Sequence, residues 1–339
     1  MQPNPRQGRP SLLHRSKFAG LSRNDIVRAI GGYIWARECG WKQVLDASVK
    51  TRWYQDGARN VHEYATPLGT IHQATAATEG QHRSRAIVEH FIKDVESLRI
   101  MRFVVEATHY ETDYEPTNRL LRETGEDGVV LSNGFCVPFI QFAKTDAGYV
   151  NAFYLWADHR KEVDRLIGAY FSSFLQGCRI VAGGPADIIA TGDNMDGCMI
   201  SPDIFKEYAI PFYRAVKAIC EAKGKIYQAH WCGRTQTLLP LVPGCGLDVV
   251  EAIVTEPMAD ISLAAALDAL RGEVVLQGGI PSVLVCDQGG RFADFERYVR
   301  EVILPLKGRP GFILGMSDNV PPNADFSRVE AVAALIGGA

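Results

Sequence analysis

The segment "YQAHWCGRTQ" places a histidine and a cysteine two residues apart, at His230 and Cys232. On a strand, residues i and i+2 project from the same face, so both side chains would reach one ion. Imidazole and thiolate both suit zinc, although an isolated His-x-Cys pair is more often an ordinary strand end. Two carboxylates, Glu251 and Asp318, follow later apolar runs and add to the pair. The sequence therefore predicts a catalytic metal site with one position open for a substrate.

Other polar residues also follow predicted strands. Asp193 and Asn194 end "DIIATGDN", and we predict that they hydrogen-bond a substrate or orient a metal ligand. Gln277 ends "EVVLQ" and is predicted to point into the mouth of the barrel, and all three are predicted as catalytic residues. The alternative for Asp193 is that it caps the loop before the next helix. Phe135 has the ring to pack on an aromatic substrate, whereas His109 also fits an ordinary surface histidine. The residues predicted to bind the substrate are His109, Tyr110, Asn133, Phe135 and Trp231.

From about residue 128, short apolar runs alternate with amphipathic helical segments, and six such units are visible. This alternation predicts a parallel sheet. We expect an α/β fold, a TIM (β/α)8 barrel with an N-terminal helical and β-hairpin extension, whose two missing strands lie within 50–127. The alternative is an open doubly wound sheet. In a barrel the polar residues would meet at the carboxyl ends of the strands, with Glu251 on the strand next to His230 and Asp318 on the last strand.

The N-terminal third has a different pattern. Helical spacing is predicted for residues 24–45, 82–101 and 113–124, and turn signals predict a β-hairpin or meander near 50–78. Residues 1–20 are predicted to be a disordered or loosely attached tail. The expected organisation is one catalytic domain, with this tail, an extension and first barrel elements at 21–127, and the main barrel body at 128–339.

Composition narrows the function classes. The 339 residues carry a net charge of −3, which gives no basic field for nucleic acid. No apolar run reaches the roughly 18 residues of a membrane span, and no signal peptide is visible. The eight cysteines are scattered through predicted core elements, which favours a reducing cytoplasm. A homodimer is left open, because the sequence does not define the oligomeric state.

The region 185–336 resembles the uroporphyrinogen decarboxylase superfamily, and within it the cobalamin (corrinoid)-dependent methyltransferases of the O-demethylase type. The resemblance rests on "GDNMDGCMISPDIFKEYAIPFY", "HWCG", "GCGLDVVEA", "LQGGIP" and "GFILGMSDNVPPNADFSRVEAV", together with "YATPLGT" nearer the N-terminus. The "RQAGR" substrate motif of the decarboxylases is missing from this sequence. The resemblance therefore implies methyl transfer and not decarboxylation of a porphyrinogen.

In these methyltransferases zinc is held by a His-x-Cys pair, a Glu on the following strand and a Cys near the last strand. The resemblance places these ligands at His230, Cys232, Glu251 and Asp318, so that an aspartate replaces the last cysteine. It implies transfer of a methyl group from a small donor, an aryl methyl ether, to cob(I)alamin on a partner corrinoid protein. The alternatives are methyl transfer from a methylcobamide to a thiol or a pterin, and a non-catalytic family member that binds a ligand or a corrinoid protein.

Overall fold

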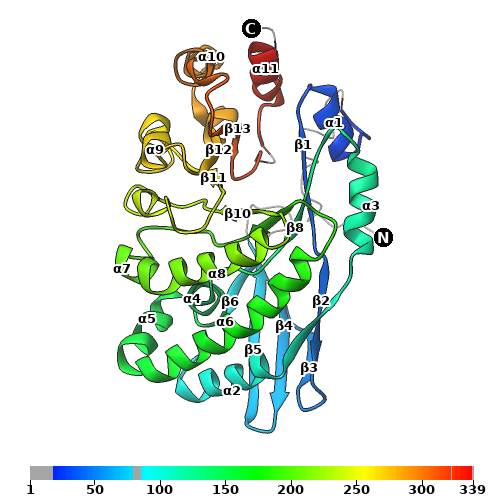
Figure 1. Cartoon of the computed structure of the whole chain (residues 1–339), viewed down its shortest axis with the longest axis vertical. Helices are drawn as coiled ribbons and strands as arrows, with labels where there is room; N and C mark the ends of the chain where they lie inside the picture. The colour runs from blue at the N-terminus through cyan, green and yellow to red at the C-terminus, as the bar shows by residue number, and fades with distance from the viewer. Residues whose placement is uncertain (1–17, 79–84, 322, 338–339) are drawn as a thin grey trace.

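A computed structural model describes residues 18–78, 85–321 and 323–337. Its centre is a curled sheet of parallel strands, the TIM-like fold that the alternation predicts (Figure 1). In spatial order the seven strands are β1 (Ile34–Glu38), β8 (Gly128–Asn133), β9 (Ile188–Thr191), β10 (Ile226–His230), β11 (Val249–Ile253), β12 (Val275–Pro281) and β13 (Phe312–Ser317).

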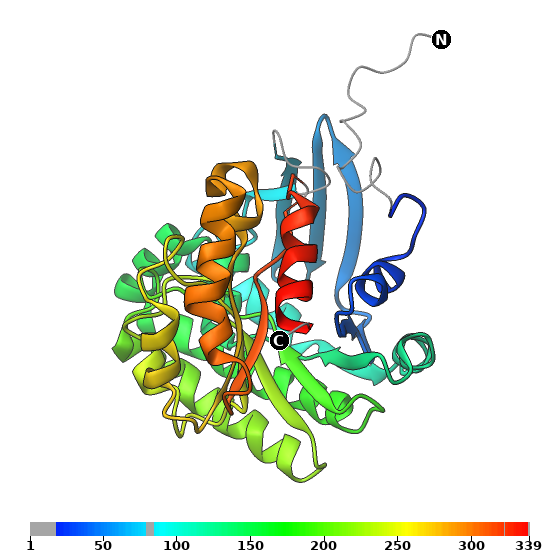
Figure 2. The same cartoon turned by 90° about the horizontal axis from the view of Figure 1, so that it is seen from above.

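Helices cover the outer face of this sheet. Figure 2 shows α10 and α11 side by side outside the strands, next to α9. The helices are α1 (Arg23–Ala29), α2 (Val95–Glu106), α3 (Glu115–Thr124), α4 (Pro138–Ile140), α5 (Tyr149–Asp158), α6 (Arg160–Ala182), α7 (Pro202–Ile204), α8 (Ile210–Glu221), α9 (Leu263–Ala269), α10 (Phe292–Tyr298) and α11 (Phe326–Gly337).

The two faces of each strand separate two cores. On β10, Tyr227 and Ala229 belong to the large core under the helices, so the residues between them face the inside of the curl. A small inner cluster of Leu131, Ile188 and Ala190 lines that inside. Period-two alternation therefore directs His230 inward, away from the helices.

Two antiparallel sheets precede and flank the barrel. One pairs β2 (Trp41–Leu45) with β7 (Thr108–Thr112). The other has the order β3 (Lys50–Asp56), β4 (Arg59–Thr66), β5 (Gly69–Ala77), β6 (Arg85–Glu89). The predicted meander near 50–78 is therefore confirmed, and its first turn uses Gly57 at φ +56°.

Three expectations for the N-terminal third were wrong. The predicted helix at 24–45 is α1 followed by β1 and β2, because the chain leaves the helix at Gly31 and Gly32. The predicted helix at 82–101 contains β6, and α2 begins only after the cap at Asp94. The barrel strands expected within 50–127 are not found in the described part of that range. The one barrel strand besides the six predicted after residue 128 is β1, which lies before residue 50. The expected tail falls largely on residues 1–17, outside the described residues.

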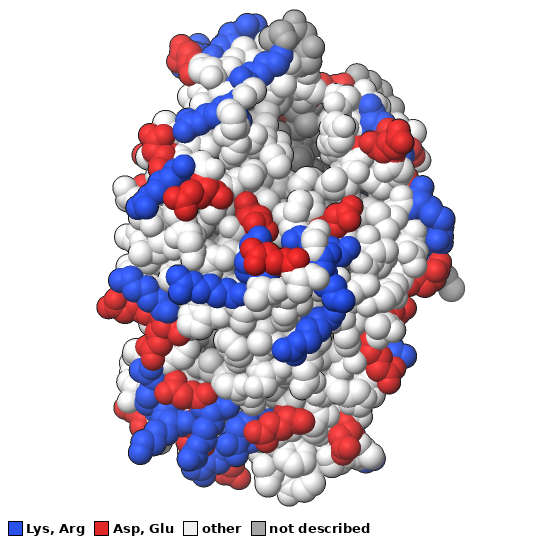
Figure 3. All heavy atoms as spheres, viewed as in Figure 1, with Lys and Arg blue, Asp and Glu red and all other residues white. Residues whose placement is uncertain are grey.

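The ends of the seven-stranded sheet are β1 and β13, and no pairing joins them among the described residues. Figure 3 shows the surface hollowed between the α11 side and the α1 side of this face. Within the described residues, no helix combines the length and the hydrophobicity needed to cross a bilayer.

Candidate metal centre

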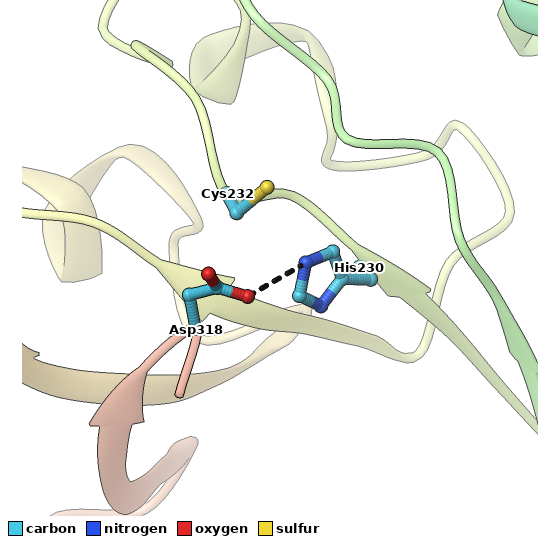
Figure 4. A group of neighbouring side chains, drawn as sticks. All are labelled: His230, Cys232 and Asp318. Atoms are coloured by element: carbon cyan, nitrogen blue, oxygen red, sulfur yellow. Dashed lines mark ion pairs between the residues drawn. The ribbon is translucent and has the colours of Figure 1, made fainter. Parts of the chain in front are cut away.

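Three side chains meet at the carboxyl-terminal mouth of the curled sheet. His230 ends β10, Cys232 follows it, and Asp318 comes directly after β13 (Figure 4). One potential ligand atom from each lies within 4.8 Å of the other two. His230 Nε2 and Asp318 Oδ1 are 3.5 Å apart. The structure therefore brings together three of the predicted ligands: both members of the His-x-Cys pair and the aspartate.

The donor set fits a zinc ion. Zinc bonds of about 2.0–2.3 Å in a tetrahedron put ligand atoms roughly 3.5 Å apart, so this cluster needs only a small contraction. Three protein ligands leave a fourth position open, as in catalytic zinc sites. Asp318 also has φ +67°, a left-handed conformation that non-glycine residues adopt rarely and mostly at functional sites.

Glu251 lies beside the cluster, although the sequence placed it among the ligands. It is the register partner of His230 on β11, and its Oε2 accepts a hydrogen bond from His230 Nδ1 at 2.6 Å. This contact leaves Nε2 of the imidazole directed toward Asp318. A carboxylate that holds the far nitrogen of a metal-binding histidine fixes its tautomer and orientation. The geometry gives Glu251 an orienting position.

The electrostatics of this pair are strongly coupled. Burial opposes the charged imidazole, but hydrogen bonds with Cys232 and Glu251 outweigh it and raise the pKa of His230 to about 10. Burial also works against the Glu251 carboxylate, yet His230 and Arg37 hold the pKa of that carboxyl below its usual value. Without a metal, His230 therefore carries a proton that a metal ion must displace.

Two cations that the sequence did not suggest support the cluster from outside. Arg37 on β1 donates from Nη2 to Glu251 Oε2 at 3.2 Å. Lys144 donates from Nζ to Asn194 Oδ1 at 3.3 Å. Arg37 lies in a segment that had been predicted as helix, and Lys144 belongs to no recognisable sequence motif. The sequence therefore did not predict a role for either residue at the site.

Asn194 contacts the cysteine of the cluster. Its Nδ2 donates to Cys232 Sγ at 3.2 Å, and its backbone N–H donates to the His230 carbonyl at 2.9 Å. The residue has φ +51°, which turns the chain after β9 toward β10. The contact places Asn194 beside the cluster, and its catalytic or ligand-orienting role stays a prediction.

Asp193 points away from the mouth. Its carboxylate is fully buried under the helices and accepts hydrogen bonds from Val137 N–H at 2.7 Å, Thr191 Oγ1 at 2.8 Å and Tyr213 OH at 2.9 Å. Burial raises the pKa of Asp193, and the three hydrogen bonds oppose that shift. The position favours a structural role for Asp193, but its partners lie on β9, on α8 and before α4, and not in the loop that it was expected to cap.

Gln277 lies on the inner face, as predicted. It is the register partner of Glu251 on β12, and its Oε1 is buried without a hydrogen-bond partner among the described residues. Gln228, two residues before His230, is fully buried, and neither atom of its amide has a partner in the described part of the chain. The inner wall below the cluster therefore holds unpaired amide groups.

Two predicted substrate residues pack inside the protein instead of lining the mouth. Trp231 is fully buried on the outer face, where its Nε1 donates to Tyr213 OH at 3.1 Å. Phe135 is buried and stacks on Trp41 at 4.5 Å between ring centroids. Both rings belong to the core under the helices. Trp231 directly follows His230, so strand alternation turns it to the opposite face.

The remaining predicted substrate residues lie apart from the cluster. Tyr110 packs edge-on against Phe135 at 4.8 Å. His109, its neighbour on β7, is exposed and lines a shallow surface depression that contains no residue of the cluster. Asn133 ends β8, where its amide contacts Cys39 Sγ at 3.6 Å. Their predicted roles stay predictions.

Comparisons with known proteins agree with this architecture. No curated protein matches the chain. A solved structure described as a methyltransferase from Methanosarcina mazei aligns with a TM-score of 0.53 at 14% identity, covering 76% of this chain and 72% of that one. Another, described as a crystal structure of IOLI protein with a binding zinc atom, aligns with a TM-score of only 0.26 at 10% identity, over 66% and 70% of the chains. The first alignment shows a shared fold.

The sequence model of one family, described as uroporphyrinogen decarboxylase (URO-D), matches residues 86–337. This match covers well over half of the chain and includes six of the seven barrel strands as well as the His230, Cys232 and Asp318 cluster. The chain therefore belongs to the uroporphyrinogen decarboxylase family.

Proposed function

We propose that this chain is a zinc-dependent methyltransferase. It moves a methyl group from a small methyl donor, an aryl methyl ether, to cob(I)alamin carried by a separate corrinoid protein. The observation that carries the proposal is the cluster of His230, Cys232 and Asp318 at the mouth of the barrel. A nitrogen, sulfur and oxygen donor set with an open position suits a catalytic zinc.

Two further observations favour methyl transfer over decarboxylation. The "RQAGR" motif of the decarboxylases is missing from the sequence. The solved structure that shares this fold is itself described as a methyltransferase. Neither observation identifies the methyl donor. The class of donor is inferred from the chemistry of the cluster.

Asp318 points to an oxygen-containing donor. A carboxylate in place of a thiolate makes a zinc site harder, which favours oxygen partners over sulfur partners. When bound, the zinc would supply Lewis acidity toward the oxygen of the ether. The C–O bond then breaks, the methyl group passes to the cobalt nucleophile, and the oxygen leaves as a phenolate-like anion. The reverse half of such a system, with a thiol acceptor, would gain more from a second sulfur ligand.

The protein residues have separate tasks in this proposal. His230, Cys232 and Asp318 hold the zinc ion. Glu251 accepts a hydrogen bond from the protonated Nδ1 of His230, so that Nε2 of the same ring stays free to bind the ion. Asn194 donates to Cys232 Sγ and limits the charge on the sulfur. The inner wall below them orients the donor, so that its methyl group faces the corrinoid.

Metal analysis tests the cluster first. Protein purified without chelator is expected to contain about one zinc per chain, and His230→Ala or Cys232→Ala is expected to lose it. Cys198→Ser is the matched control, because Cys198 is an exposed cysteine that contacts Arg234 and lies outside the cluster. Equal zinc content in all four proteins would contradict the assignment of the ligands.

Visible absorption tests the reaction. Anaerobic incubation with free cob(I)alamin and a panel of aryl and alkyl methyl ethers is expected to form methylcobalamin, fastest with an aryl ether. Consumption of added methylcobalamin only when a thiol or a pterin is present would replace the proposal with the reverse transfer. Zinc-loaded protein that is inactive in both directions would favour a non-catalytic binding role.

A further inference from the structure

The strand β3 lies at the edge of its sheet, far along the chain from the metal cluster. Among the described residues its only neighbour in the sheet is β4, and all seven residues of β3 are exposed. Trp53 is 69% exposed, although it stacks on His62 of β4 at 3.8 Å between ring centroids. An edge strand of this kind offers unpaired backbone groups to another strand.

The hairpin geometry indicates which backbone groups face outward. Asp56 and Arg59 close a two-residue turn, and the closing pair of such a turn is hydrogen-bonded. Hydrogen-bonded and non-hydrogen-bonded pairs alternate along an antiparallel ladder. Thr51, Trp53 and Gln55 therefore fall at positions whose N–H and C=O point away from β4. A strand added to this edge would pair with these three residues.

We propose that β3 pairs antiparallel with β3 of a second copy of this chain, centred on Trp53 of both copies. The two four-stranded sheets would then form one continuous sheet across a two-fold axis.

The charges on β3 are complementary to themselves in this register. Lys50 faces Asp56 of the second copy, and Asp56 faces Lys50, so that two oppositely charged pairs form. Arg52 faces Tyr54, a pairing that already occurs within one copy, where the guanidinium lies 4.5 Å from the ring centroid. Neither Lys50 nor Asp56 has a salt bridge to another described residue, so both are free to pair.

Neighbouring registers are less favourable. A slip of two residues in one direction places Arg52 directly opposite Arg52 of the second copy, and like charges repel across a ladder. A slip in the other direction pairs Arg52 with Asp56, but it leaves Lys50 and Thr51 of both copies without partners in β3. The register centred on Trp53 uses all seven residues and opposes no like charges. The second copy is therefore the occupant that fits this edge best.

No residue of β3 belongs to the metal cluster. His62 beneath Trp53 is uncharged at neutral pH, since burial lowers its pKa to about 4. The His62 ring therefore adds no charge next to the edge on which the second copy would pair. Dimer formation and metal binding can be measured independently.

Sedimentation velocity over a concentration series tests the proposal with charge reversal. Wild-type protein is expected to dimerise, and Lys50→Asp or Asp56→Lys alone is expected to weaken the dimer about ten-fold or more, because each creates two like-charge pairs. The double variant Lys50→Asp/Asp56→Lys restores opposite charges at both pairs and is expected to regain wild-type association. An equimolar mixture of the two single variants is expected to form a heterodimer, since every introduced charge then meets its opposite.

Circular dichroism and zinc content control for misfolding, and both are expected to be unchanged in these surface variants. Wild-type protein that stays monomeric up to its solubility limit would overturn the proposal. A dimer that is insensitive to all these substitutions would also overturn it, because the two copies would then associate through another surface.

Discussion

Two sets of buried polar side chains lie on opposite faces of the barrel sheet. On the outer face, the carboxylate of Asp193 accepts three hydrogen bonds and is enclosed by the helices. On the inner face, both amide atoms of Gln228 and the Oε1 of Gln277 have no partner among the described residues. The first set is satisfied by the protein itself, and the second is not.

Asp193 is satisfied within the fold, whereas we propose that Gln228 and Gln277 are placed to hydrogen-bond a ligand. A buried polar group without a hydrogen bond costs about 1–3 kcal/mol, whereas a satisfied one does not. The unpaired amides lie on the wall below His230, two residues away along β10 and one strand beyond Glu251. A cost of this kind is expected where side chains must hydrogen-bond a substrate.

The largest expected effect is a loss of stability on removal of Asp193, the hydrogen-bonded carboxylate on the outer face. Asp193→Ala leaves three buried donors without an acceptor and is expected to lower the free energy of unfolding by about 3–5 kcal/mol. Chemical denaturation measures this loss. Asp203→Asn is the control, because its side chain is 94% exposed and its removal is expected to change stability little. A small effect at Asp193 would remove the basis for the comparison.

A second buried carboxylate, Asp146, is expected to make the stability of the protein depend on pH. Burial raises the pKa of Asp146 to about 7, although Tyr170 and Gln141 donate to it. In the unfolded chain its pKa is about 3.9, so between pH 4 and 7 the folded state binds the extra proton and stability falls as the pH rises. The expected fall is about 2–4 kcal/mol. Asp146→Asn should flatten this part of the stability curve, measured by denaturation across the window; parallel curves would contradict the pKa.

The orienting role of Glu251 predicts an effect on metal affinity. Glu251→Gln is expected to weaken zinc binding about 10–100-fold, because the amide no longer fixes the His230 tautomer as a carboxylate does. Arg37→Met, one contact further away, is expected to weaken it less. Competition with a zinc chelator measures both. If Glu251→Gln removed zinc as completely as His230→Ala, Glu251 would be a direct ligand, as the sequence suggested.

The smallest effect has the opposite sign. Gln228→Leu replaces an unpaired buried amide with an apolar side chain of similar volume, and it is expected to raise the free energy of unfolding by about 1 kcal/mol in metal-free protein. The same change is expected to impair donor binding. Destabilisation comparable to that of Asp193→Ala would show that Gln228 is part of a satisfied network.

The sequence alone determined the barrel strands after residue 128 and the pairing of His230 with Cys232. Both follow from local periodicity: strand alternation fixes which residues share a face, and parallel strands bring their carboxyl ends to one rim. The register partner of His230 was also visible, because Glu251 lies in the next predicted strand. The N-terminal third was less readable, since short strands such as β1 and β6 lie in segments whose spacing also fits a helix.

Only the tertiary structure decided the roles around the cluster. Arg37 reaches Glu251 across 214 residues, and no sequence spacing predicts such a contact. Asp193 and Asn194 are adjacent, yet one enters the outer network and the other contacts Cys232, because the chain turns through a left-handed conformation between them. The direction of a side chain beyond the end of a strand depends on what packs against that loop, and those neighbours come from distant parts of the chain.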